Sequence, residues 1–112
     1  MRRILHWLVK KDKKLFGLLK EQSKNALEIA KELKTFVDNY EEVGRNERKH
    51  RAEAIKNIKL KEDKIFHDIA VKLNENFKIR FDKKDIEDIA FLLDDIVKSI
   101  NDGTLMFVAL SI

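Results

Sequence analysis

The sequence predicts an all-α fold in which three long antiparallel helices form an up-down-up bundle in one domain. The 112-residue chain has no proline and no cysteine, and its residues are 44% hydrophobic and 39% charged. This composition is typical of long amphipathic helices, and the absence of proline removes the strongest interruption to a helix. Apolar residues also recur at alternating steps of three and four, which is the helical period. We expect helices at residues 12–44, 47–76 and 83–112.

The first helix is expected to begin at Asp12, a residue type that caps helix N-termini, and to end before Gly44. Glycine is common just after a helix because it adopts the left-handed conformation without strain. The seam of this helix comprises Leu15, Leu19, Gln22, Ala26, Ile29, Leu33, Phe36, Tyr40 and Val43. Because the seam keeps a heptad-like period, it predicts packing against neighbouring helices along its full length.

The second helix carries a carboxylate where its period requires an apolar residue. Its seam comprises Ala52, Ile55, Ile58, Ile65, Ile69 and Leu73, and Glu62 falls at the centre of this stripe. An ionised carboxylate at a core position must be paired, hydrogen-bonded or metal-bound, because burying it alone is very costly. Glu62 is therefore the clearest departure from the apolar pattern of the predicted core.

The third helix shows an apolar period that runs through the polar residues Asn101, Asp102 and Gly103. Asp82 is its expected N-cap. Its seam comprises Ile86, Ile89, Leu93, Ile96, Ile100, Gly103, Phe107 and Leu110. This register favours a helix that continues to about Ile112, with Gly103 permitting close approach of another helix. The last nine residues are apolar on nearly all sides, so we expect a partner to cover them, most simply in a homodimer.

The first eleven residues form a basic amphipathic segment with Ile4, Leu5, Trp7 and Leu8 among its apolar side chains. Such a segment either lies peripherally on a membrane surface or covers the end of the bundle core. No apolar run approaches the ~20 residues that cross a bilayer, so a cytoplasmic location, at most peripheral at the inner face of the membrane, is expected.

The charge distribution gives one candidate anion site and argues against nucleic acid. The net charge is only +4, and no aromatic residues interleave the basic ones as in nucleic-acid-binding surfaces. The candidate anion-binding residues are Arg45, Arg48, Lys49 and Arg51, at the start of the second helix. The alternative is a solvated turn whose charge nearby glutamates offset. An enzyme is not expected, because no nucleophile motif or phosphate-binding loop is present.

The chain resembles the PhoU-like family of phosphate-transport regulators, in the branch formerly of unknown function. The resemblance is carried by K-K-D-K-K-L-F-G-L-L-K-E-Q, E-D-K-I-F-H-D-I, F-K-I-R-F-D-K-K-D-I and L-L-D-D-I-V-K-S-I. It implies half of a six-helix fold, since only the first three-helix unit of the family matches; the second unit is absent or supplied by another copy. It also implies regulation of inorganic phosphate uptake and clusters of iron, zinc or other divalent cations on acidic helix motifs.

The family's metal motif is an acid followed four residues later by aspartate, and this chain departs from it. The motif aligns on Lys59 and Asp63 and on Asp94 and Lys98, so a lysine replaces one acid in each pair. Each pair then becomes an i,i+4 pair of opposite charges. Our hypothesis is that metal binding is weakened or lost. The residues of a reduced site would be Glu62, Asp63, His67, Asp94 and Asp95, although His67 equally fits a helix-surface residue.

Three functions follow as expectations. The first is a PhoU-like accessory protein that binds another protein, such as the cytoplasmic face of a phosphate transporter. The second is a metal-binding helical bundle. The third is a basic scaffold on membrane or nucleic acid.

Overall fold

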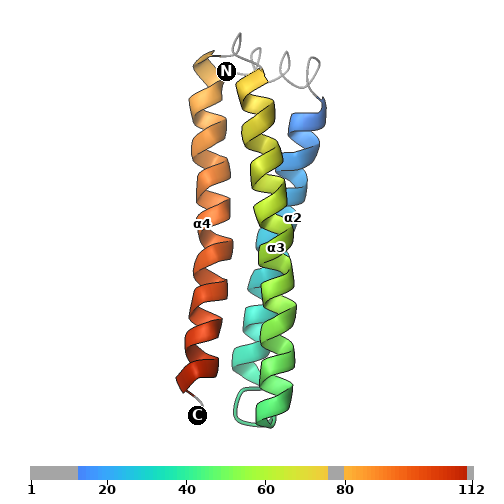
Figure 1. Ribbon diagram of the computed structural model, residues 1–112, viewed down its shortest axis with the longest axis vertical. Helices are drawn as coiled ribbons and strands as arrows, with labels where there is room; N and C mark the ends of the chain where they lie inside the picture. Colours follow the sequence, from blue (N-terminus) through green and yellow to red (C-terminus); the bar gives the residue numbers. More distant parts are fainter. Residues whose placement is uncertain (1–12, 76–79, 111–112) are drawn as a thin grey trace.

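The three-helix prediction is confirmed by the computed structural model, which describes residues 13–75 and 80–110, with side chains except at residues 80–82. The helices are α2 (Lys13–Asp38), α3 (Arg45–Glu75) and α4 (Arg80–Leu110). They lie side by side in an up-down-up arrangement about 52 Å long (Figure 1). The expected N-terminal segment, the Asp12 cap, the turn after α3 and the Asp82 side chain lie outside the described parts. No helix in those parts is long and apolar enough to cross a bilayer.

The first helix ends at Asp38, six residues before the predicted end, so that prediction was wrong. The side chain of Asn39 donates a hydrogen bond of 2.8 Å to the Thr35 carbonyl, which the Asn39 backbone N–H also contacts at 3.1 Å. Such local side-chain bonds compete with helix continuation. Gly44 has no positive φ. Its carbonyl instead accepts the Arg48 N–H at 3.0 Å, so Gly44 begins α3 rather than terminating α2.

The core of the bundle is divided into two apolar clusters. One contains Leu15, Ile69, Leu73, Ile86 and Ala90, and the other contains Ile29, Phe36, Ala52, Ile55, Ile58 and Val97. Between them lies one polar level, at which α2, α3 and α4 contribute Gln22, Glu62 and Asp94. The fold thus places these three buried polar side chains between two apolar halves.

The predicted seams of α2 and α3 are confirmed at their main positions. On α2, side chains seven residues apart are fully or almost fully buried: Leu15, Gln22, Ile29 and Phe36. On α3 the buried set includes Ile55, Glu62 and Ile69, so the central position of Glu62 is also confirmed.

The predicted seam of α4 is confirmed at Ile86, which is buried, and was wrong at four of its eight positions, because the helix is rotated from the expected orientation. Ile89, Ile96, Phe107 and Leu110 are exposed. The buried residues of α4 are Ile86, Ala90, Asp94, Val97, Asn101 and Thr104. Several of the largest apolar side chains of α4, among them Phe91 and Leu92, remain exposed.

The predicted continuation of the third helix is confirmed, since α4 runs without a break through Asn101, Asp102 and Gly103. Asn101 is buried and the Thr104 hydroxyl donates to the Ile100 carbonyl at 2.8 Å. No described atom lies within 4 Å of the position that a Cβ at Gly103 would occupy. The close helix approach expected at Gly103 therefore does not occur within the chain.

Candidate functional site

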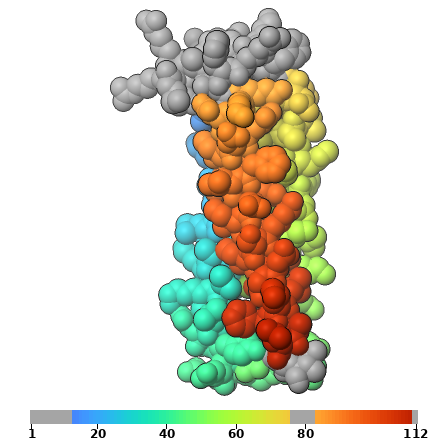
Figure 2. Space-filling model, turned by 90° about the vertical axis from the view of Figure 1, so that its left-hand side faces the viewer, coloured from blue at the N-terminus to red at the C-terminus, as the bar shows by residue number. Residues whose placement is uncertain are grey.

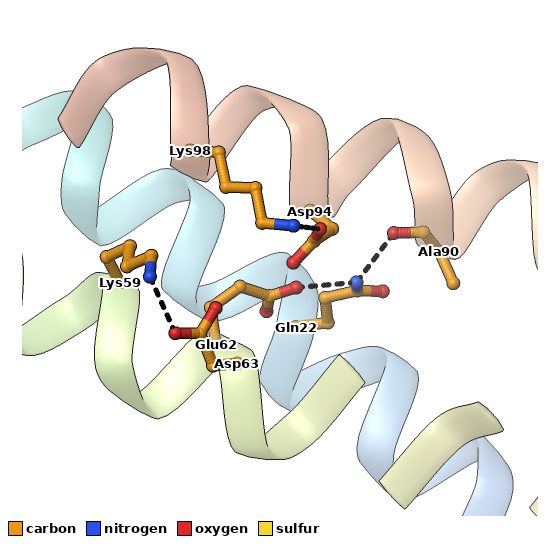
Figure 3. A network of polar contacts seen from close by, with 7 residues as sticks. All are labelled: Gln22, Lys59, Glu62, Asp63, Ala90, Asp94 and Lys98. Carbon is orange, nitrogen blue, oxygen red and sulfur yellow. Dashed lines mark hydrogen bonds and ion pairs between the residues drawn. The ribbon is translucent and has the colours of Figure 1, made fainter. Parts of the chain in front are cut away.

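The first candidate site is the polar layer, which we define as Gln22, Glu62 and Asp94 between the two apolar clusters (Figure 3). Gln22 and Glu62 are completely buried and Asp94 is 3% exposed. Each side chain comes from a different helix. The layer forms because α2, α3 and α4 each direct one polar side chain into the core at the same level along the bundle.

Gln22 connects the three helices through its amide group. Its Nε2 donates to Glu62 Oε2 on α3 and to the Ala90 carbonyl on α4, both at 2.8 Å. A primary amide has two N–H donors, so both are used. When the Glu62 carboxylate is ionised, this hydrogen bond is stronger than one between two neutral groups.

Two lysines neutralise the neighbouring acids, as the four-residue spacing predicted. Lys98 lies 3.0 Å from Asp94, and Lys59 lies 2.8 Å from Asp63. The hydrogen bond to Asp94 raises the pKa of Lys98 above its ordinary value. The Lys59–Asp63 pair stands at the half-exposed edge of the layer, whereas Asp94 is inside it. Each lysine thus offsets the negative charge of the aspartate with which it is paired.

Glu62 and Asp94 each retain one buried oxygen without a hydrogen-bond donor, Oε1 and Oδ1 respectively. An ionised carboxylate has no donor of its own, so two ionised groups here cannot satisfy each other. Burial raises the pKa of Glu62 from 4.5 to about 7; Asp94 raises it further, and the Gln22 hydrogen bond opposes both. A proton on Glu62 removes one buried charge and supplies the missing donor toward Asp94.

The five candidate metal ligands do not converge. Glu62 and Asp94 meet in the core, and Asp63 is held by Lys59 at its edge. His67 and Asp95 are exposed on the outer surfaces of α3 and α4. Within the described ranges, no three acidic or histidine side chains are placed to hold one ion. Two carboxylates beside an ammonium group are a poor fit for iron or zinc, which require several donors without an adjacent cation.

The candidate anion-binding cluster is partly engaged within the chain. Arg48 Nε donates to the Tyr40 carbonyl at 2.7 Å, and its guanidinium lies 4.0 Å from the Tyr40 ring centre. Arg51 forms an ion pair of 3.3 Å with Glu47. Arg45 and Lys49 are exposed. Arg48 is therefore held by Tyr40, before α3, and Arg51 by Glu47 in the first turn of α3.

A second candidate site is a partly exposed, mostly apolar surface shared by α2 and α4; all of its α4 residues except Leu92 belonged to the seam predicted to face the core. We call it the α2–α4 face. On α2 it comprises Phe16, Leu19, Ser23, Ala30 and Val37, and on α4 Ile89, Leu92, Ile96, Gly103, Phe107 and Leu110. On α4, Leu92 is 67% exposed and Leu110 is 81% exposed. The spacing of three and four places each set on one side of its helix.

Ring contacts show which side of α4 carries this face. Phe107 lies 6.2 Å from Phe36 and 5.6 Å from Tyr40, so its side of α4 borders α2. Phe91 lies 5.3 Å from Phe66 on α3, on the other side. Figure 2 shows α4 toward the viewer with α2 along one edge and α3 along the other. The α2–α4 face therefore lies over the junction of the two parallel helices.

Sequence reasoning also missed three buried polar residues, Asn25, Asn101 and Thr104. The signal for two of them was present: Asn101 and Thr104 continue the spacing of Ala90, Asp94 and Val97. The prediction instead assigned the core-facing side to a more hydrophobic row of residues on the same helix.

No model of a known protein family, no curated protein and no solved structure matches this chain. The polar layer and the α2–α4 face are therefore the observations from which a function can be argued.

Proposed function

We propose that this chain is a non-enzymatic accessory protein that acts by binding other proteins, in the setting of inorganic phosphate transport that the PhoU-like resemblance implies. The observation that carries this proposal is the α2–α4 face. Its apolar side chains follow α4 from Ile89 to Leu110, about six turns of helix at 3.6 residues per turn.

An apolar surface of this length is a contact surface. Single exposed apolar residues are ordinary on any protein, but large contiguous patches mark sites of association. The face is formed by two parallel helices, and a third helix can pack into the groove between their ridges. A helical partner therefore fits this surface best.

The polar layer supports a role without catalysis. Its two carboxyl groups resemble an acid–base pair in composition, and the raised pKa of Glu62 would suit proton transfer at neutral pH. Catalysis, however, requires contact between the carboxyl group and a substrate. Glu62 is completely buried and Asp94 is 3% exposed, so the layer fits a structural or regulatory role in the bundle interior.

Affinity capture tests the proposal. The immobilised chain is expected to retain an inorganic phosphate transporter from the same organism, and Leu92→Lys should reduce retention at least tenfold by placing a charge on the α2–α4 face. Leu60→Lys is the matched control, because Leu60 is 51% exposed on α3. Equal retention by both variants, or no retention by the unaltered chain, would contradict the proposal.

A metal-binding bundle is the second candidate function, favoured by the two buried oxygens of Glu62 and Asp94 that lack donors. A cation would satisfy both. Lys98, 3.0 Å from Asp94, opposes cation binding there by repulsion. A basic scaffold on membrane or nucleic acid has less support, since Arg48 and Arg51 are held by Tyr40 and Glu47.

A further inference from the structure

The α2–α4 face is bordered by charges of opposite sign on its two long edges. The edge on α2 carries Lys13, Lys20, Lys24 and Lys31, and the edge on α4 carries Asp88, Asp95 and Asp102. All seven are exposed. None forms an ion pair within 4 Å with a residue that the structure describes. The face is thus an apolar strip whose margin is mainly basic on α2 and mainly acidic on α4; the exceptions are Asp38 and Lys84, one on each margin.

We infer that a second copy of this chain covers the α2–α4 face, related by a two-fold axis parallel to the helices. This inference rests on the proposed function, in that the second copy occupies the same contact surface in the free protein and the transporter binds there in its place. A two-fold interface brings one surface against itself, so that surface must be complementary to its own rotated copy. A strip with one basic and one acidic edge meets that requirement.

The charges select one of the two possible two-fold arrangements. An axis parallel to the helices places α2 of one copy along α4 of the other, so that each lysine edge meets an aspartate edge. An axis perpendicular to the helices in the plane of the face would place α2 against α2, with lysines opposite lysines. Opposite charges across an interface fix its orientation, and like charges exclude the alternative.

The register along the helices agrees with this arrangement. Gln22 is bonded to Ala90, and Phe36 packs against Phe107. Residues of α2 therefore lie level with residues of α4 that follow them by about 70 positions. Lys24 and Lys31 come level with Asp95 and Asp102, to within about one helical turn. Rotation about an axis parallel to the helices preserves these levels, so the two charged pairs recur on both edges.

The α2–α4 face is also large enough to form a stable interface between two copies. The 26 residues of α2 span about 39 Å at about 1.5 Å per residue, and two helices side by side are about 20 Å wide. The product is about 800 Å² for each copy, which is the area that each partner contributes to a standard stable interface.

Charge reversal tests the pairing directly in the full chain. Light scattering at micromolar concentration should give twice the 13.2 kDa chain mass. Lys24→Glu with Lys31→Glu, and separately Asp95→Lys with Asp102→Lys, should each give monomers, because like charges then meet on both edges. All four substitutions together should restore the dimer. Circular dichroism confirms that each variant remains helical.

Cross-linking tests the orientation, since the chain has no native cysteine. Oxidation of a Lys31→Cys, Asp102→Cys double variant should give a covalent dimer, whereas either single variant should stay mostly uncross-linked, because its cysteines lie on opposite edges. Cross-linking of Lys31→Cys alone would overturn the parallel axis, and a monomeric wild-type chain would overturn the second copy altogether. A monomer that still captures the transporter would leave the proposed function standing. A dimer that captures none would overturn only the function.

Discussion

Gln22 on α2 donates a hydrogen bond of 2.8 Å to Glu62 on α3, and the same amide nitrogen donates to Ala90 on α4. The two residues are completely buried and separate the apolar clusters of the core. Because their bonds can form only when the three helices lie at one relative level, they favour a single register of the bundle. Buried polar side chains have this role in coiled coils at a cost in stability.

Replacing Gln22 by leucine should destabilise the bundle by about 1–3 kcal/mol. The substitution leaves Glu62 Oε2 without its donor, and an unsatisfied buried group costs about 1–3 kcal/mol, whereas the Ala90 carbonyl keeps its hydrogen bond within α4. Urea unfolding followed by circular dichroism measures the change in the free energy of unfolding. Ser23→Ala, at the exposed neighbouring position, should change it by less than about 0.5 kcal/mol.

Replacing Glu62 by glutamine should stabilise the protein at pH 8 and have little effect near pH 4. The raised pKa of Glu62, about 7 against 4.5, means that the folded state binds more protons than the unfolded state between these values. The contribution of Glu62 to stability is therefore fully present below pH 4.5 and is lost as the pH rises through 7. The loss amounts to roughly 3 kcal/mol at most.

The difference in unfolding free energy between Glu62→Gln and the unaltered chain should accordingly grow from pH 4.5 to 7 and then level off. Both proteins are compared at one concentration, because association would shift apparent stability. Asp63→Asn is the control, since Asp63 is at the half-exposed edge. Parallel pH profiles for Glu62→Gln and the unaltered chain would show that Glu62 titrates normally.

Restoring the acids of the motif should create a metal site. Lys98→Glu with Lys59→Glu removes the ammonium groups now 3.0 Å from Asp94 and 2.8 Å from Asp63 and adds two carboxylates in their place. Carboxylate number and charge govern divalent-cation affinity, so calorimetry with zinc or manganese should show at least tenfold tighter binding than in the unaltered chain. Stoichiometric metal in the unaltered chain would contradict the hypothesis that metal binding is weakened or lost.

Arg48→Ala should destabilise the protein by about 1–2 kcal/mol, because it removes a 2.7 Å hydrogen bond to the Tyr40 carbonyl and a cation–π contact with its ring. Lys49→Ala, an exposed neighbour, should be nearly neutral. Thermal unfolding of both variants measures this contrast. Equal effects, with weaker phosphate binding in both, would favour the anion site instead.

The sequence alone was sufficient for the features that depend on spacing within one helix. The heptad spacing predicted the burial of Ile29 and Phe36, and the four-residue spacing predicted the Lys59–Asp63 and Lys98–Asp94 pairs. The end of α2 was missed because the Asn39 side chain bonds the backbone locally, which periodicity does not reveal.

The side of α4 that faces the core could not be predicted, since the helix has two stripes suited to packing. Hydrophobicity favoured the stripe of Ile89 and Ile96, whereas the folded chain buries Ala90 and Val97. Which stripe is buried depends on the rotation of α4 against its neighbours. Glu62 and Asp94 had been expected in one site with Asp63, His67 and Asp95, but that these two alone are buried together in the core required the structure.

The central claim, that protein covers the α2–α4 face, is tested most directly by hydroxyl-radical labelling of the purified full chain with mass-spectrometric readout. Leu92 and Leu110 should be labelled at least fivefold less than their exposures of 67% and 81% in the single chain imply. Leu60 on α3, 51% exposed, should be labelled as its exposure implies. Labelling of Leu92 at or above the rate of Leu60 would contradict the account.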